Sequence, residues 1–205
     1  MRLFPVLFII LIFCTAGVYA ETPEEYTKQA IALYDQGQYE QAIEILDKAL
    51  AINPKEIEAL NTKGKAYKGL EKYEESLATL DEALKIDPTY TKAWNNKGNT
   101  YTYMGKYDDA IIMFDKALEL DPKYAKAWSN KGWCLNLAGR NEEALTCLEK
   151  ATTLDPEYSR GWSNMGDALR ALGRNDEAIK AYDQALAIDP ELSEALEGKA
   201  AITGA

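Results

Sequence analysis

Paired carboxylates are the residues in this sequence whose recurrence first suggests acid–base chemistry. They repeat every 34 residues, as Glu74 and Glu75, Asp108 and Asp109, and Glu142 and Glu143. The chain has no histidine, so the commonest general base and every Ser-His or Cys-His nucleophile arrangement are missing. Carboxylates at the start of a helix are explained by the helix dipole, which favours negative charge there. The residues therefore predict a protein that is not an enzyme.

Two cysteines, Cys134 and Cys147, follow a third in the N-terminal segment. Cys134 occupies a position where the equivalent residues are Ala or Thr, which favours a buried free thiol, and a Cys134–Cys147 disulfide is the alternative. Neither thiol has a further partner at metal-ligand spacing, and there is no C-x-x-C motif. The glycines recur singly and do not form a phosphate-binding loop. We expect no metal and no cofactor.

Three cations are each followed four residues later by asparagine. The pairs are Lys92 with Asn96, Lys126 with Asn130, and Arg160 with Asn164. A cation in the first turn of a helix is mildly disfavoured by the dipole, so something should offset it. One candidate is the preceding aspartate, at 87, 121 and 155. The other is the carboxylate of a ligand whose backbone the amides would bind.

The sequence repeats with a period of 34 residues, and the repeated units must position these side chains. Five units cover residues 23–56, 57–90, 91–124, 125–158 and 159–192, and a partial sixth covers 193–205. Numbered from one within each unit, position four is aromatic or Leu, position eight is Gly or Ala, and position 32 is always Pro. A fixed period of this length predicts stacked repeats.

Each unit reads as two helices. Apolar residues at positions four, seven to eight and eleven share one helical face, and a break near position fifteen ends the first helix, usually at Gly. The second helix runs from about position eighteen to thirty and stops at Asp-Pro or Asn-Pro. Glycine at position eight indicates close helix approach, and Trp94, Trp128 and Trp162 at position four are interpreted as packing residues. Residues 193–205 predict a capping helix that starts at a Ser193 cap.

This succession of aromatic, small, apolar, small and Pro positions closely resembles the tetratricopeptide repeat. The resemblance implies an all-α, right-handed solenoid of five helix-turn-helix repeats plus a capping helix. Its sequence style is similar to exported prokaryotic, particularly archaeal, members. In such arrays the first helices line a concave groove that holds extended peptides or partner helices. The groove residues that the resemblance implies are Lys92, Asn95, Asn96, Asn99, Tyr103, Lys126, Asn130, Trp133, Leu137, Arg160, Asn164 and Arg170.

An aromatic cluster is the second feature of this implied groove. Trp133, Leu137 one turn later and Tyr103 of the preceding unit should all face it. Exposed aromatic side chains with a polar rim are typical of interaction sites. The alternative is that Trp133 packs on Leu137 and only stiffens the array. The chaperone-adaptor form of the family grips a carboxylate with five residues, a pattern that this sequence retains only in part.

The first twenty residues differ in composition from the repeats. Arg2 is their only charge, residues 3–13 are almost all apolar, and small residues precede Glu21. This pattern predicts a cleaved secretory signal peptide at residues 1–20. A retained membrane anchor at residues 3–19 is the alternative, and lipid attachment at Cys14 is disfavoured by Phe13. Each alternative places the repeats outside the cytoplasm.

The charge limits the partners. The formal net charge is −10, and removal of residues 1–20 takes away only Arg2. Nucleic-acid binding needs a basic surface, so we expect no nucleic-acid partner. We expect no small-molecule substrate, and membrane contact only through an uncleaved N-terminal segment. The sequence predicts an extracytoplasmic scaffold that binds a protein or peptide, including one that bears a carboxylate. The alternative is an architectural or self-associating module with an empty groove.

Overall fold

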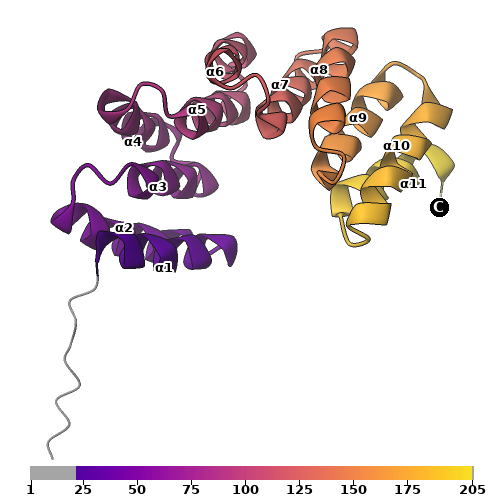
Figure 1. The fold of residues 1–205 in the computed structure, drawn as a ribbon. Coiled ribbons are helices and arrows are strands. Elements are labelled where there is room, and N and C mark those ends of the chain that lie inside the picture. Colours follow the sequence, from indigo (N-terminus) through magenta and orange to yellow (C-terminus); the bar gives the residue numbers. More distant parts are fainter. Residues whose placement is uncertain (1–21, 205) are drawn as a thin grey trace, which may run out of the picture.

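The computed structural model describes residues 22–204, and these form eleven α-helices. The helices are α1 (Pro23–Asp35), α2 (Tyr39–Ile52), α3 (Ile57–Gly69), α4 (Tyr73–Ile86), α5 (Thr91–Tyr103), α6 (Tyr107–Leu120), α7 (Ala125–Leu137), α8 (Asn141–Leu154), α9 (Ser159–Ala171), α10 (Asn175–Ile188) and α11 (Ser193–Thr203). Consecutive helices pack in pairs, and the pairs stack into an arch (Figure 1). Helices α3, α5 and α7 lie on its inner side, whereas α4 and α6 lie on its outer side (Figure 1). The predicted all-α, right-handed solenoid is confirmed.

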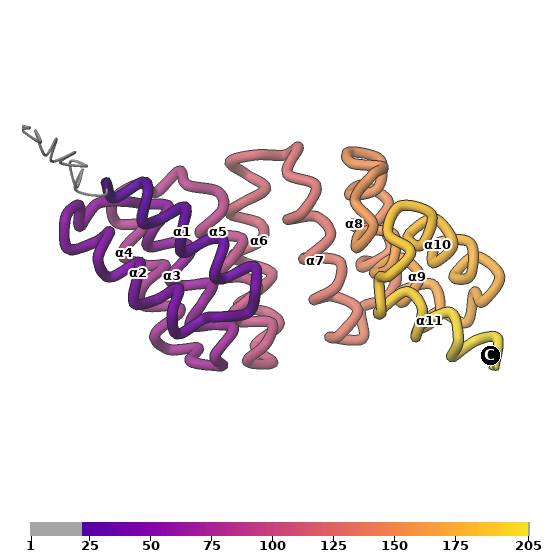
Figure 2. The backbone as a smooth tube through the Cα atoms, turned by 90° about the horizontal axis from the view of Figure 1, so that it is seen from below, coloured from indigo at the N-terminus to yellow at the C-terminus, as the bar shows by residue number. Residues whose placement is uncertain are grey.

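The stacking is continuous along the chain. The backbone tube in Figure 2 shows each helix pair beside the next, from α1 to α11. Buried clusters include residues from neighbouring pairs, such as Leu80 of α4 with Ala93 of α5. The core is therefore a series of connected layers in which each unit depends on its neighbours. The predicted leader at residues 1–20 lies outside the described residues.

Glycine at position eight allows the two helices of one unit to approach closely. A Cβ atom added to Gly98 would lie 2.6 Å from the ring of Phe114, and one added to Gly166 would lie 2.5 Å from the ring of Tyr182. Phe114 and Tyr182 are fully buried at position 24 of their units. The expected close approach is confirmed, because a Cβ atom at these glycines would displace a core side chain.

The turn between the paired helices uses the left-handed backbone region. Gly37, Gly105, Gly139 and Gly173 have φ between 72° and 76°. Their position-fifteen equivalent in the second unit is Glu71, which has φ 58°. A side chain costs about 1–2 kcal/mol in that conformation, so the second turn carries strain that the other four avoid.

The tryptophans at position four pack against the core, as interpreted from the sequence. Trp94, Trp128 and Trp162 are half-buried beside the hydrophobic clusters. Each indole N–H donates to the carbonyl of the proline six residues earlier, at 2.8–2.9 Å. The indoles thus anchor each first helix to the loop that enters it.

Ion pairs link the first helix of a unit to the second helix of the preceding one. Lys63 Nζ donates to Asp47 Oδ1 at 2.6 Å, and Lys131 Nζ to Asp115 Oδ1 at 2.6 Å. Lys97 pairs with Asp81 and Lys199 with Asp183 in the same way. The junction of the fourth and fifth units differs, because Met165 takes the lysine position there.

The capping helix departs from one expectation. Ser193 is the first residue of α11 and does not cap it: the cap residue is Leu192, and the Ser193 hydroxyl donates to Glu194 instead. This prediction was wrong because the helix begins one residue earlier than expected. Leu196 of α11 is 48% exposed, whereas Gly198 contacts Tyr182 so closely that a Cβ atom would clash.

The structure also shows the state of the two cysteines and allows a search for metal-ligand clusters and membrane-spanning helices. Cys134 and Cys147 are both free and buried. Burial raises the pKa of both thiols, so the unreactive thiol form is favoured. Among the described residues there is no cluster of three or more potential metal ligands. Within the same range, no helix is long and apolar enough to cross a membrane.

Candidate binding groove

Side-chain hydrogen bonds hold the first helices in register along the inner side of the arch. Each joins the amide at position six to position five of the preceding unit. The bonds are Asn96 Nδ2 to Asn61 Oδ1 (2.7 Å), Asn130 Nδ2 to Asn95 Oδ1 (2.9 Å) and Asn164 Nδ2 to Ser129 Oγ (3.0 Å). Because these bonds fix neighbouring helices against each other, residues at equivalent positions form columns.

The hydrogen-bond series stops at Ser163. Its hydroxyl is buried and has no hydrogen-bond partner, because the residue at position six of the next unit is Gly198. Glycine is required there by the ring of Tyr182. An unpaired buried hydroxyl is therefore the local cost of fitting the final helix.

The column at position two is acidic at its ends and basic in its middle, in the order Glu24, Glu58, Lys92, Lys126, Arg160 and Glu194. Lys92 Nζ lies 3.2 Å from a Glu58 carboxylate oxygen, and Arg160 lies 3.7 Å from Glu194. Over residues 22–204, Lys126 makes no ion pair with any carboxylate. The cations therefore do not pair with the preceding aspartates. Asp87, for instance, accepts hydrogen bonds from Thr89.

Two adjoining hollows lie between these columns. The first, here called the aromatic hollow, has a volume of about 300 Å³ and is lined by Lys68, Asn99, Tyr103, Asn130, Trp133, Arg160, Asn164, Asp167 and Glu194. The second, called the cationic hollow, has a volume of about 550 Å³ and is lined by Tyr34, Asp35, Glu58, Asn61, Lys65, Lys68, Lys92, Asn95, Asn96, Asn99, Tyr124, Lys126, Asn130, Tyr158 and Arg160. Because the hollows share lining residues, they form one continuous groove across α3, α5, α7 and α9.

The aromatic hollow contains a pair of contacting rings, of which Tyr103 is exposed and Trp133 is half-buried. Tyr103 and Trp133 have ring centroids 5.4 Å apart with planes tilted by 56°, an arrangement that favours aromatic attraction. Tyr103 is 54% exposed even with this contact. Lys68 Nζ lies 4.4 Å from the Tyr103 ring centroid, within cation–π range. The rings thus present apolar surface beside a cation.

The cationic hollow concentrates positive charge in an acidic protein. Five cations line it against two carboxylates, Asp35 and Glu58. Burial lowers the pKa of Lys65, Asp35 and Glu58 partly offset this, and the nearby charges of Lys126 and Lys92 lower it further. Burial likewise lowers the pKa of Lys68, helped by Lys65. An anion placed here would relieve this repulsion.

Tyr124 and Tyr158, at the last position of the third and fourth units, line the cationic hollow, and Tyr90 at the equivalent position of the second unit bonds to the lining residue Glu58. The Tyr90 hydroxyl donates to Glu58, and burial together with this bond raises the pKa of Tyr90. Burial also raises the pKa of Tyr124 and Tyr158, so these phenols remain neutral hydrogen-bonding groups. These tyrosines were not among the predicted groove residues, although the recurrence of tyrosine at that position was a usable signal.

The structure brings most of the predicted site residues together. All line one of the two hollows except Leu137 and Arg170. Leu137 is 46% exposed beyond the hollows, and Arg170 pairs with Asp167 and contacts the Tyr182 hydroxyl. Asn95 lines the groove but is only 5% exposed, and its amide serves the hydrogen bonds between units. Lys65 and Lys68 are further groove residues that the prediction omitted.

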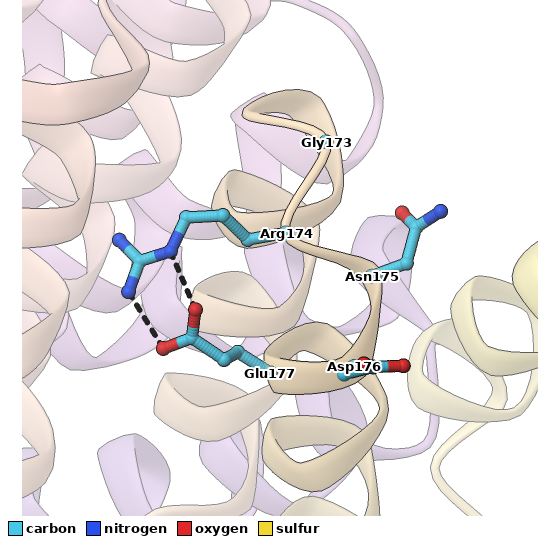
Figure 3. A pocket seen from close by; sticks show the side chains of 5 residues that line it. All are labelled: Gly173, Arg174, Asn175, Asp176 and Glu177. Atoms are coloured by element: carbon cyan, nitrogen blue, oxygen red, sulfur yellow. Dashed lines mark hydrogen bonds and ion pairs between the residues drawn. The ribbon is translucent and has the colours of Figure 1, made fainter.

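Another hollow lies at the turn between α9 and α10, and Figure 3 shows its lining residues. Arg174 donates two hydrogen bonds, of 2.7 and 2.6 Å, to the carboxylate of Glu177. Arg140 and Glu143 repeat this pair one unit earlier. Since the charges satisfy each other at equivalent helix starts, we assign this hollow a structural role.

Several solved structures share the fold. A thermophilic TPR protein of Thermus thermophilus, TTC0263, matches with a TM-score of 0.82 at 21% identity, over 90% of this chain and 100% of that one. PilF of Pseudomonas aeruginosa matches with a TM-score of 0.73 at 20% identity, over 89% and 83%. YrrB, described as a TPR protein with an unusual peptide-binding site, matches with a TM-score of 0.58 at 24% identity, over 85% and 90%. No curated protein sequence matches the chain.

Family models give a more specific result. Four models, all described as tetratricopeptide repeat, match residues 33–97, 91–124, 113–146 and 138–193. Their ranges overlap, so together they cover residues 33–193 without a gap. Proteins built on this repeat are generally scaffolds for protein–protein interaction and not enzymes, and no catalytic family is indicated. The chain belongs to the tetratricopeptide repeat family.

Proposed function

We propose that this protein is a non-enzymatic scaffold that binds a peptide segment of a partner protein in the groove formed by its second to fifth units. The observation that carries the proposal is the contact of the exposed Tyr103 ring with the half-buried Trp133 ring, which lies next to a cluster of incompletely paired cations. Exposed aromatic residues in a hollow gain free energy when a partner covers them. The peptide-binding site described for YrrB supports the same use of this fold.

The charges favour a ligand that bears a carboxylate. Lys126 is a cation without an ion pair among the described residues, and Lys65 and Lys68 have lowered pKa values that an anion would raise. A hydrogen bond between an ammonium group and a carboxylate is stronger than one between neutral groups. The asparagine amides already form hydrogen bonds between neighbouring units. Only their remaining N–H and C=O groups can bind the backbone of a ligand.

We further propose that the protein acts outside the cytoplasm. This rests on the sequence of residues 1–20, with their apolar stretch and the small residues before Glu21. Cell fractionation combined with N-terminal sequencing tests it: a mature chain that starts at Glu21 in the extracytoplasmic fraction is expected. A cytoplasmic chain that keeps Met1 would contradict the proposal.

Site-specific photo-cross-linking tests the groove. A photoreactive phenylalanine analogue at position 103 is expected to capture a partner in cells. The same analogue at position 85 provides the matched control, because Lys85 is exposed and lies on α4, at the outer side of the arch. Capture at position 103 that disappears with Trp133→Ala supports the groove. Equal capture at both positions would exclude it.

One observation favours self-association as a second candidate. Ile112 and Leu120 are both exposed and lie about two turns apart on one face of α6. Light scattering at increasing concentration should show a constant mass if the chain is a monomeric scaffold. A mass that rises with concentration and falls back with Ile112→Lys would favour the self-associating module.

A further inference from the structure

Helix α7 presents four residues along one face, of which all but Leu137 line the groove. Lys126, Asn130, Trp133 and Leu137 follow each other at intervals of four, three and four residues, which places them in one row. The row begins with a cation, continues with an amide already bonded to Asn95, and ends with apolar side chains. A ligand strand along α7 would therefore meet charge first and apolar surface second.

The position-two column restricts where a ligand carboxylate can bind. Glu58 already lies beside Lys92, and Glu194 lies beside Arg160. These two glutamates pair with the cations on either side of Lys126, and their negative charges repel any further anion nearby. Lys126 has the Tyr158 ring near its ammonium group, 5.9 Å from the centroid, and no carboxylate of the described residues. The middle of the column is thus the open anion position.

The distance between Lys126 and Trp133 in this row sets a spacing for the ligand. Seven residues separate Lys126 from Trp133, so at about 1.5 Å per residue they lie about 10 Å apart along the helix axis. An extended peptide advances about 3.3 Å per residue. The separation therefore corresponds to about three residues of an extended ligand.

We propose that the ligand is a peptide segment with an acidic side chain bound at Lys126 and a large apolar side chain about three residues away, packed on Tyr103 and Trp133. Glu58 and Glu194 act as built-in carboxylates that fix this position and disfavour ligands with acids at neighbouring positions. This inference rests on the proposed function. It specifies the sequence pattern that the groove selects.

The charge pattern favours such a peptide over a nucleic acid. A nucleic acid carries a phosphate on every residue, whereas the column accepts an anion at its centre and carries carboxylates at both sides. The net charge of −10 adds general repulsion of a polyanion. A segment with a single acid meets the open cation and avoids both glutamates.

A defined peptide panel tests the pattern. Fluorescein-labelled Gly-Ser peptides, acetylated and amidated at their ends, carry one Glu and one Phe separated by one to six residues. Fluorescence anisotropy is expected to show tightest binding at a separation of about three. Replacing Glu with Gln in the peptide, or Lys126→Ala in the protein, should weaken binding about tenfold or more. Trp133→Ala should weaken it about thirtyfold.

The two glutamates have their own test. A peptide with a second Glu should bind Glu58→Gln or Glu194→Gln about two- to fivefold more tightly than it binds the wild type, since an exposed ion pair contributes modestly. Lys116→Ala is the matched control, because Lys116 pairs with Glu119 on α6 and should leave all affinities unchanged. Helical circular dichroism verifies that each variant is folded.

The outcomes separate the pattern from the proposed function. Binding that ignores the Glu–Phe separation, or that Lys126→Ala retains, overturns the pattern. The same holds if no peptide binds while position 103 still cross-links a partner, or if a single-stranded oligonucleotide binds at Lys126 more tightly than the peptides. Failure of both the panel and the groove-specific cross-link overturns the pattern and the proposed function together.

Discussion

Lys63 and Lys65 both lie on α3, yet their pKa values shift in opposite directions. Burial alone would lower the pKa of Lys63, but the hydrogen bond and charge of Asp47 outweigh this and raise it. Burial lowers the pKa of Lys65, and the charges of Asp35 and Glu58 oppose this effect without reversing it. One lysine faces a packing surface between units that supplies its partner, and the other faces a groove that does not. Incomplete pairing, rather than residue type, thus distinguishes the groove from the packing surface.

The largest difference between the two surfaces should appear on truncation of an aromatic residue. Phe114→Ala empties a fully buried site beneath Gly98 and should cost about 3–5 kcal/mol of unfolding free energy. Trp133→Ala removes a half-buried groove ring and should cost about 1 kcal/mol. Urea unfolding followed by circular dichroism compares them, and equal losses would show that Trp133 belongs to the core.

A smaller difference is expected for two lysines of α7. Lys131→Met breaks the pair with Asp115, where the lysine side chain is only 18% exposed, and should cost about 1 kcal/mol. Lys126→Met removes a cation that has no ion pair among the described residues and should change stability by less than about 0.5 kcal/mol. The same unfolding assay measures both. Equal destabilisation would contradict the distinction between packing and groove lysines.

The turn at Glu71 touches neither surface and provides a neutral reference. Glu71→Gly removes the strain of φ 58° and should stabilise the chain by about 0.5–1 kcal/mol. Thermal unfolding gives the measurement, with Gly139→Glu as the reverse change in an unstrained turn. A stabilised Glu71→Gly variant should keep the affinity of the wild type for its ligand. A change in affinity would show that strain at this turn reaches the groove.

The pH dependence should be the smallest effect. The pKa values of Lys65 and Lys68 lie below the ordinary 10.5, so the folded state binds fewer protons there than the unfolded state. Their contribution to stability therefore rises with pH up to about 10.5. Lys63 has a raised pKa, so its contribution is present below 10.5 and is lost above it. NMR of the side-chain nitrogens measures the pKa values of the three lysines. Lys65 and Lys68 are expected to deprotonate at a lower pH than Lys63. Deprotonation of Lys63 before the other two would contradict this prediction.

The fold was predictable from the sequence because the period repeats backbone requirements. Gly98 at position eight and Gly105 at position fifteen each answer a local demand, for close packing and for a left-handed turn. These residue requirements can be recognised within a single unit, and their recurrence in five units strengthens the prediction. The Ser193 cap failed because a helix start can shift by one residue without disturbing the apolar pattern.

The groove was predictable only in outline. The resemblance implied which positions face it, but side-chain partners depend on how separate units align in space. The burial of Asn95 follows from a bond to Asn130, 35 residues away. The pairing of Lys92 with Glu58 likewise appears only when equivalent positions form a column. The cation–π contact of Lys68 with Tyr103 needs the same three-dimensional register.

The unpaired hydroxyl of Ser163 has a consequence for how such an array can lengthen. If the 34 residues 159–192 were duplicated in tandem, the asparagine at position six of the new copy would meet this hydroxyl as a ready acceptor. The copy's own serine at position five would then take over the unpaired place beside Gly198. Growth by duplication would thus move the defect outward without adding another, and the join would gain a hydrogen bond at once.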